Sequence, residues 1–476
     1  MSSLLDALLS TVNGPTYQVA HPADPQGLLR RFLMATMDDV RLHWADEYSQ
    51  LILRHRDLDD ASHFRHAVMR REIVSDITYE QQRDHSAHTL YNYLLGWCFF
   101  ESIPAVREAF TTQLRRRSGA DSDPAPERLA RAFANVWVWA SLLHDVGYLF
   151  EGGIVALSPA IQDDRVRRGV EVTRDFFDHR FWMEIRFPSR ARRRLLLEGI
   201  SLTTPQFEGS SLGAVADSLR SLPRLDQLRR FVSDALQSRK HQVPPQLEQE
   251  GGLPHDTFDL WATHYEAYGE PAMAARIRTL ADLFDLLVWR GIPHVGVRVL
   301  DHGVCSGLLL LQYSTFYYAL FAALGRDRPR EHDRLAVWSA FHDRGGFRYE
   351  PAWWWTLHVW GTAAAAVHNL VQVSGKWAGA SARVEPLRLA EDPIAYLGVM
   401  VDIIEEWDRY SVRRGSRLLV PSSSYAKLPL QGVDVSLEYA EQKLILGVPA
   451  DRMSGIEKDL DLALEGWREI LAIRST

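Results

Sequence analysis

A buried histidine–aspartate pair is the clearest indication of chemistry in this sequence. His144 and Asp145 are adjacent, and no other residue between Arg131 and Glu151 titrates near or below neutral pH. An unpaired buried carboxylate is costly, so Asp145 must be neutralised, hydrogen-bonded or bound to a cation. Neighbouring helix residues project about 100° apart, which lets both side chains reach one metal ion or one metal pair. A metal ion is the simplest solution, and a hydrogen-bonded core histidine is the alternative.

Asp402 presents the same burial problem farther along the chain. It interrupts an apolar stretch, Tyr396 to Ile404, that has the length of a helix. Glu405, Glu406 and Asp408 follow at what we expect to be the solvated end of that helix. Asp402 and Asp145 share one solution if both bind the same ion.

Four further histidines are candidate ligands. His85 and His88 lie three residues apart, on one face of a helix that we predict from 83 to 100. His302 follows Asp301, a candidate N-cap that would place His302 in the first turn of a buried helix. His368 lies deep in an uncharged segment. Each of these histidines alone would more often be a core residue than a metal ligand.

The run Leu142-Leu-His-Asp-Val-Gly-Tyr148 resembles the signature of the HD-domain superfamily of metal-dependent phosphohydrolases. The order His, His-Asp, His, His, Asp resembles the six-ligand, two-metal branch of that superfamily, over roughly residues 85–410. The resemblance implies metal ligands at His88, His144, Asp145, His302, His368 and Asp402. It favours His88 over His85, because His-Thr-Leu followed by Leu94-Leu-Gly96 is similar to the opening helix of the family. His85 is the alternative ligand, or a group near the substrate.

The resemblance implies that His88, His144 and Asp402 hold one ion, that His302 and His368 hold the other, and that Asp145 bridges them. Mixed imidazole and carboxylate ligands suit Mn, Fe, Co, Ni or Zn. Two such ions activate a bridging water and clamp a phosphate through its oxygens.

The reaction implied is therefore hydrolysis of a phosphoester, with a nucleotide or another small phosphorylated molecule as substrate. We expect Asp145, His144 and His85 to be the catalytic residues. Two alternatives stay open: a di-iron oxygenase of the same fold, and a non-catalytic sensor or scaffold that keeps the metal for structure.

Phosphate oxygens that are not bound to metal need hydrogen-bond donors. Arg83 and Arg409 are candidates for this role, and a surface position is the alternative for each. His358 follows the run Trp353-Trp-Trp355, which could stack a base near the site. Core packing is the alternative for that run.

Composition limits the class of protein. The chain has 476 residues, of which 46% are hydrophobic and 24% charged, with a net charge of −7. This balance gives no bulk positive field that would attract an anionic membrane, and it makes nucleic acid an unlikely partner. Two cysteines form no disulfide framework, and we see no signal peptide, so we expect a cytoplasmic protein. Residues 303–325 and 353–375 are uncharged but contain polar groups, which favours core helices over membrane spans.

The hydrophobic periodicity predicts a mainly α fold, with an HD-type helical bundle as its core. We divide the chain into an N-terminal helical segment (1–80), the first half of the core (81–155), an insertion or subdomain (156–295), the second half of the core (296–412) and a C-terminal β-hairpin with a helix (413–476). The hairpin should turn near Glu441-Gln442. Ser454 to Glu457 fits a capping box, which predicts a helix with Ile456, Leu460, Leu464, Trp467 and Leu471 on its apolar side.

Overall fold

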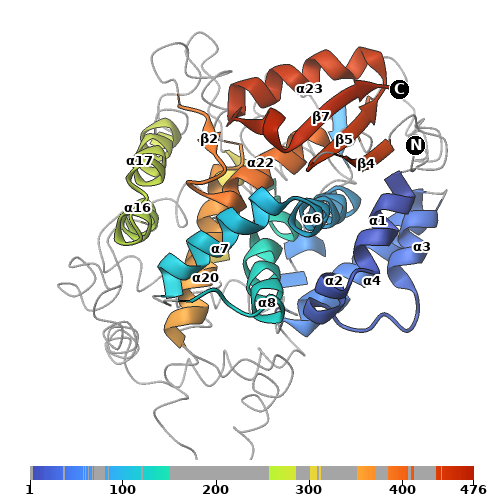
Figure 1. Cartoon of the computed structure of the whole chain (residues 1–476), viewed down its shortest axis with the longest axis horizontal. Helices are drawn as coiled ribbons and strands as arrows, with labels where there is room; N and C mark the ends of the chain where they lie inside the picture. The colour runs from blue at the N-terminus through green and yellow to red at the C-terminus, as the bar shows by residue number, and fades with distance from the viewer. Residues whose placement is uncertain are drawn as a thin grey trace, which may run out of the picture.

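The protein is described by a computed structural model that covers most of the predicted core. The described residues are 4–148 with gaps at 36–37, 57, 59–60, 63, 67, 69–80, 84 and 119–121, then 257–285, 301–311 without 308–309, 351–369, 384–405, 409–411, and 436–476 without 441. Most of them are helical and the strands are short, so the prediction of a mainly α fold is confirmed (Figure 1).

The centre of the fold is a bundle of buried helices. α6 (His85–Ser102), α8 (Pro126–Trp137), α20 (Pro351–Val367) and α22 (Pro393–Ile404) pack together, and α8 continues into the π-helix η2 (Val138–Leu142). α6 has no Asp, Glu, Lys or Arg between His85 and Phe100, and every residue from Ser86 to Phe100 is buried. A helix that is apolar on all sides belongs in a core, which explains why α6 is surrounded by its neighbours.

A glycine sets the separation of two of these helices. A Cβ atom on Gly96 would lie 2.1 Å from the Trp137 ring, and the Trp137 indole N–H donates to the Tyr93 carbonyl at 3.0 Å. The missing side chain therefore lets α8 lie close against α6.

The N-terminal helices cover one side of this bundle. α1 (Leu4–Val12) and α4 (Asp38–His55) pack on α6, α2 (Pro15–Ala20) packs on α8, and α3 (Leu28–Met34) packs on α4. Arg56 joins the layers, because its guanidinium donates to the Ala20 carbonyl at 2.6 Å and to Asn135 Oδ1 at 2.5 Å.

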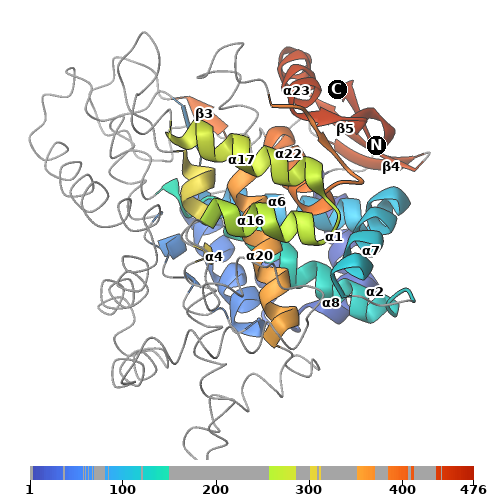
Figure 2. The same cartoon turned by 90° about the vertical axis from the view of Figure 1, so that its left-hand side faces the viewer.

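Two helices from the stretch assigned to an insertion pack on the core. α16 (Thr257–Ala267) and α17 (Pro271–Asp285) pack against each other and cross in front of α20 in Figure 2, and α16 contacts α20. The Tyr265 hydroxyl donates to Asp392 Oδ2 at 2.5 Å, and the Trp360 indole donates to Asp392 Oδ1 at 3.0 Å. Asp392 also caps α22 by accepting from the backbone N–H groups of Ile394 and Ala395. Residues 156–256 lie outside the described part.

α7 (Pro104–Ser118) follows α6 and contacts α22. Two short strand pairs connect distant segments: β1 (Gln81–Arg83) is antiparallel to β3 (Arg409–Ser411), and β2 (Leu387–Arg388) is parallel to β6 (Leu464–Glu465). The β1–β3 pair joins the residues just before α6 to the residues just after α22, which fixes these two helices relative to each other.

The C-terminal unit is a three-stranded sheet with the order β4-β5-β7. β4 (Ser436–Ala440) and β5 (Lys443–Val448) form the predicted hairpin, which turns at Gln442 with a φ of 65°. β7 (Leu471–Ser475) pairs in parallel with β5, and α23 (Ala450–Ala463) connects them.

The predicted capping box is wrong. α23 begins at Ala450, after Pro449, so Ser454 lies inside the helix. The apolar positions are buried as expected, but the helix ends at Ala463, Trp467 lies in the 3₁₀-helix η7 (Trp467–Glu469), and Leu471 pairs with Leu444 of β5. Strand pairing with β5 overrides the local helical pattern at this end of the chain.

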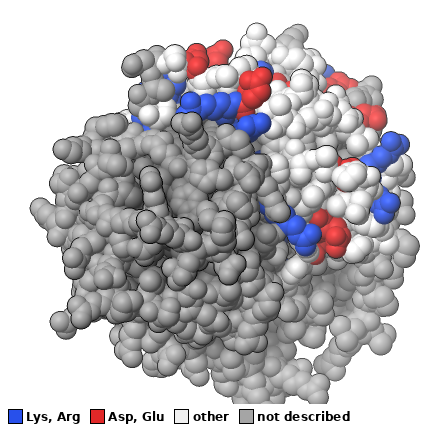
Figure 3. Space-filling model, turned by 90° about the horizontal axis from the view of Figure 1, so that it is seen from below, with Lys and Arg blue, Asp and Glu red and all other residues white. Residues whose placement is uncertain are grey.

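Charges on the visible surface are mixed. In Figure 3 basic and acidic side chains are interspersed over the described part of that face rather than separated by sign. Among the described residues, no helix has the length and hydropathy that a membrane span requires.

Candidate metal centre

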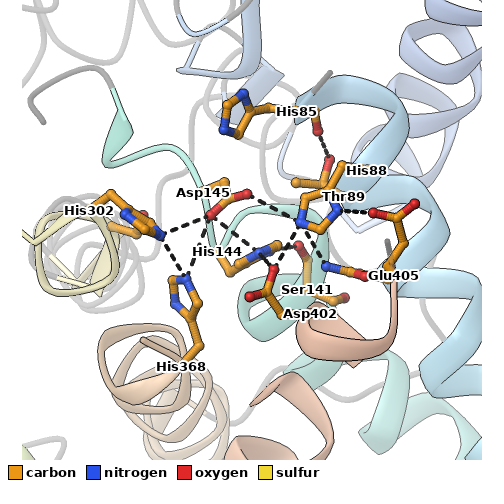
Figure 4. A network of polar contacts seen from close by, with 12 residues as sticks. His85, His88, Thr89, Ser141, His144, Asp145, His302, His368, Asp402 and Glu405 are labelled. Carbon is orange, nitrogen blue, oxygen red and sulfur yellow. Dashed lines mark hydrogen bonds and ion pairs between the residues drawn. The ribbon is translucent and has the colours of Figure 1, made fainter. Parts of the chain in front are cut away.

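The structure brings the six predicted metal ligands to one place in the core (Figure 4). They come from five segments: α6, the turn after η2, the helix at 302–307, the end of α20, and α22. All six side chains are buried, with exposed fractions between 0% and 8%: His88, His144, Asp145, His302, His368 and Asp402.

Asp145 is common to two groups of side chains that could each hold a metal ion. The first group is His88, His144 and Asp145, and the second is Asp145, His302 and His368. Asp145 Oδ2 lies 3.5 Å from His88 Nε2, and Asp145 Oδ1 lies 3.7 Å from His302 Nε2 and 3.6 Å from His368 Nε2. Asp145 Oδ1 also lies 3.2 Å from His144 Nε2, so this one carboxylate contacts the side chains of both groups.

Asp402 extends the first group. Its Oδ1 atom lies 3.0 Å from His88 Nε2 and 3.7 Å from His144 Nε2. Adjacent ligand atoms bound at about 2.0–2.2 Å from one ion lie roughly 3 Å apart, so this spacing fits coordination of a common ion.

The π-helix positions His144 and Asp145. The Leu143 N–H donates to the Val138 carbonyl at 3.2 Å, five residues back, and the chain then turns through residues 143–147. Such widened turns are frequent at functional sites because they redirect side chains at the end of a helix. Here the turn directs both members of the pair into the bundle.

Gly147 brings the helix at 302–307 against this turn. A Cβ atom on Gly147 would lie 1.9 Å from the His302 carbonyl oxygen and 2.5 Å from Ser306 N. The Gly147 N–H also donates to Ser306 Oγ at 2.7 Å. The absence of a side chain at Gly147 is therefore a condition for the approach of His302 to Asp145.

Three of the histidines have their Nδ1 atoms held by acceptors outside the centre. His88 Nδ1 donates to Glu405 Oε2 at 2.6 Å, His368 Nδ1 donates to the Ala365 carbonyl at 2.6 Å, and His144 Nδ1 donates to the Ser141 carbonyl. A neutral imidazole that donates from Nδ1 carries a lone pair on Nε2. These bonds therefore direct three metal-binding lone pairs toward the two aspartates.

A bound cation would satisfy the buried acceptors of this arrangement. The Nε2 lone pair of His88 and a carboxylate oxygen of Asp402 face each other at 3.0 Å, and the Asn92 amide donates to the same Nε2 atom at 3.0 Å. Within the described residues, His144 Nε2 and both oxygens of Asp145 are buried without a hydrogen-bond partner. Buried acceptors without donors are costly, and a bound metal ion satisfies them together. The side chains present therefore fit a metal centre.

The protonation states of Asp145 and His368 are those that metal binding needs. Burial alone would raise the pKa of Asp145, but His144, His85 and the other nearby histidines hold it well below its usual value. Burial lowers the pKa of His368 to about 4, and repulsion from His144 and His302 contributes. At neutral pH Asp145 is thus an anion and His368 a neutral ligand.

Asp301 anchors the second group. Its Oδ1 atom accepts from the Val304 N–H at 2.8 Å, which confirms the predicted N-cap, and its Oδ2 atom accepts from the Asn369 amide at 2.7 Å. These two bonds tie the start of the helix that carries His302 to the residue after His368.

Glu405 is a functional residue that the sequence pattern did not reveal. We expected it at the solvated end of α22, but it is fully buried and bonds His88. It lies three residues after Asp402, on the same side of the helix. The acidic run Glu405, Glu406 and Asp408 looks like a solvated helix end, and the spacing from Asp402 was the only signal against that interpretation.

His85 lies beside the centre without belonging to either group. Its ring centroid is 4.0 Å from that of Tyr148, and Tyr148 stacks on His302 at 3.9 Å. His85 is half-buried, and its charge lowers the pKa of Asp145. The structure thus distinguishes His88, which is within reach of both aspartates, from His85, which neighbours the second group through Tyr148.

The predicted substrate-binding residues lie in different surroundings. Arg83 and Arg409 are paired directly in the β1–β3 ladder; Arg83 lies two residues before His85, and Arg409 lies four residues after Glu405. Their side chains are outside the described part of the structure. His358 is buried in α20, ten residues before His368, which corresponds to about 15 Å along the helix axis. The centroid of its ring lies 4.5 Å from that of Trp139. Its contact with a substrate stays a prediction without support from these surroundings.

Comparison of the chain with models of protein families, with characterised proteins and with solved structures finds no match. What the centre does must therefore be argued from its geometry.

Proposed function

We propose that this protein is an HD-type, metal-dependent phosphohydrolase that hydrolyses a nucleotide or another small phosphoester. The observation that supports the proposal is the position of Asp145, whose carboxylate belongs to both groups of candidate ligands. A carboxylate shared by two ion positions would keep the two ions close together, as two-metal hydrolysis of a phosphoester needs.

The ligands divide between two positions in this proposal. His88, His144 and Asp402 hold the first ion, His302 and His368 hold the second, and Asp145 contacts both. When bound, the two ions supply a Lewis-acid clamp for phosphate oxygens and lower the pKa of a water between them. Imidazole and carboxylate ligands favour Mn, Fe, Co, Ni or Zn over Mg or Ca.

The other residues orient the ligands and move protons. Glu405, the Ser141 carbonyl and the Ala365 carbonyl fix the ring orientations of three ligand histidines. His85 is a titratable side chain that neighbours the second group through Tyr148 and is not itself a ligand, so we assign its imidazole to donation of a proton to the leaving alkoxide. Arg83 and Arg409 would supply donors to phosphate oxygens that are not on metal.

The test is a metal-dependent turnover assay carried out with and without oxygen. The purified protein is first analysed for bound metal, then stripped and reloaded with Mn²⁺ or Co²⁺, and offered nucleotides and cyclic nucleotides. We expect release of phosphate or a nucleoside monophosphate under anaerobic conditions, because hydrolysis needs only a Lewis acid and water. Asp145→Asn is the inactive control.

Two outcomes would overturn the proposal. Oxygen consumption by iron-loaded protein, coupled to substrate loss without hydrolysis of any phosphoester, would establish the oxygenase alternative. Two tightly bound ions without turnover of any phosphoester offered would favour a centre that is structural.

A further inference from the structure

The two metal positions are not equivalent in their protein ligands. The first has four candidate ligands, namely His88, His144, Asp402 and the shared Asp145. The second has three among the residues that the structure describes, His302, His368 and the same Asp145. The first position therefore has one more protein ligand and one more carboxylate than the second.

A buried carboxylate behind His88 increases this difference. Glu405 accepts from His88 Nδ1 at 2.6 Å, and the side chains of both residues are 0% exposed. The corresponding Nδ1 atoms of His144 and His368 donate to neutral backbone carbonyls. A carboxylate partner makes an imidazole a stronger metal ligand than a carbonyl partner does.

No equivalent carboxylate supports the second position in the described part of the chain. Asp301 is the nearest candidate by sequence, but its two oxygens accept from the Val304 N–H and from the Asn369 amide. Asp301 thus orients the backbone around His302 and His368 without contributing charge through a ligand ring. Metal affinity rises with the number of charged ligands, so the two positions should differ in affinity.

We propose that the first position holds its ion tightly, that the second binds its ion more weakly and exchanges it, and that Glu405 is the positioning residue responsible for much of the difference. This rests on the metal centre of the proposed function but not on the reaction assigned to it. With fewer protein ligands, the second position keeps more coordination sites open for an oxygen atom of the substrate.

The experiment is a titration of the metal-free full-length protein with Mn²⁺, in which free Mn²⁺ is followed by electron paramagnetic resonance. We expect two binding steps whose dissociation constants differ at least tenfold. Glu405→Gln keeps the size of the side chain and an acceptor oxygen but removes the charge. It should weaken the tight step about 10- to 100-fold and leave the weak step unchanged.

Two further variants separate this effect from a loss of folding. Glu270→Gln makes the same change in another buried glutamate, which accepts from Gln113 away from the centre, and it should alter neither step. His368→Ala should remove the weak step and leave the tight one, so it tests the inference even if Glu405→Gln does not fold.

Two equal binding steps in the wild-type protein, or loss of the tight step in His368→Ala, would overturn the inference. An unchanged tight step in folded Glu405→Gln would remove the role of Glu405. A failure to find hydrolysis would count against the proposed function only, because the titration does not depend on turnover.

Discussion

The Nδ1 atom of His88 lies 2.6 Å from a carboxylate oxygen of Glu405, and neither side chain is exposed to solvent. The bond joins α6 to the end of α22, and it leaves Nε2 of His88 directed at Asp145 and Asp402. This contact between residues 88 and 405 thus orients the His88 ring and links two core helices.

Replacement of the shared carboxylate should remove the metal. Asp145→Ala deletes the side chain that the two described ligand groups share, so we expect the folded protein to lose both ions and all activity, with some loss of stability. Metal content per chain after dialysis measures this, and Asp46→Ala, which removes a carboxylate paired with His66 elsewhere, is the control. Two equivalents of metal retained by Asp145→Ala would show that Asp145 is not the bridge.

His88→Ala should reduce metal content far more than His85→Ala. His88 reaches both aspartates through Nε2, whereas His85 contacts the ring of Tyr148 and belongs to neither ligand group. His85→Ala should retain the metal but lose activity, because the imidazole is assigned to proton transfer. Equal metal loss in the two variants would make His85 a ligand.

A methyl group at Gly147 should disturb the second metal position. Gly147→Ala forces the added Cβ against the His302 carbonyl and Ser306, so we expect a loss of about 1–3 kcal/mol in stability and weaker binding of one ion. Thermal unfolding with and without Mn²⁺ measures both effects. Gly455→Ala is the matched control, because it lies in α23 with nothing within 4 Å of the new atom, and it should be neutral or stabilising.

Stability of the metal-free protein should fall as the pH falls below about 6.5. Burial lowers the pKa values of His21, His264 and His358 well below 6.5, and nearby Arg56 and Arg117 add to the effect at His21 and His264, respectively. The unfolded chain then binds more protons than the folded one in this window, so each histidine contributes a slope of up to about 1.4 kcal/mol per pH unit.

His264→Phe tests the pH dependence at one residue. The Nε2 atom of His264 is buried without a hydrogen-bond partner in the described structure, so a ring that cannot be protonated should be tolerated. The variant should lose stability less steeply than the wild-type protein between pH 6.5 and 5 in urea titrations, where the histidine of the unfolded chain becomes charged. His43→Gln changes an exposed histidine and should not alter the slope; an unchanged slope in His264→Phe would contradict the assignment.

The core helices could be predicted from the sequence because a helix with so few charged residues is expected to be buried. α6 and α22 have no Lys or Arg, and His88 of the first and Asp402 of the second meet at the centre. The same argument failed for Glu405, since two more acidic residues follow it closely and a buried carboxylate cannot be distinguished from a solvated one in such a run.

Tertiary contacts explain what the pattern did not reveal. Arg276 resembles a surface residue in the sequence, yet it is buried and donates to the Glu385 and Pro386 carbonyls and to Glu391, which helps to hold α17 on the core. At the C-terminus, pairing of Leu471 with Leu444 replaces the helix that local periodicity favours. In both cases the deciding partner is distant in sequence.

The pairing of β1 with β3 also affects when, during synthesis of the chain, the first metal position can form. Gln81 pairs with Ser411, and His88 depends on residues 402 and 405, so the first metal position cannot be completed until most of the chain has left the ribosome. The ligands of the second position, at 145, 302 and 368, are all synthesised earlier. Contacts across such long separations form slowly, so binding of an ion at the proposed first position would be a late event in folding.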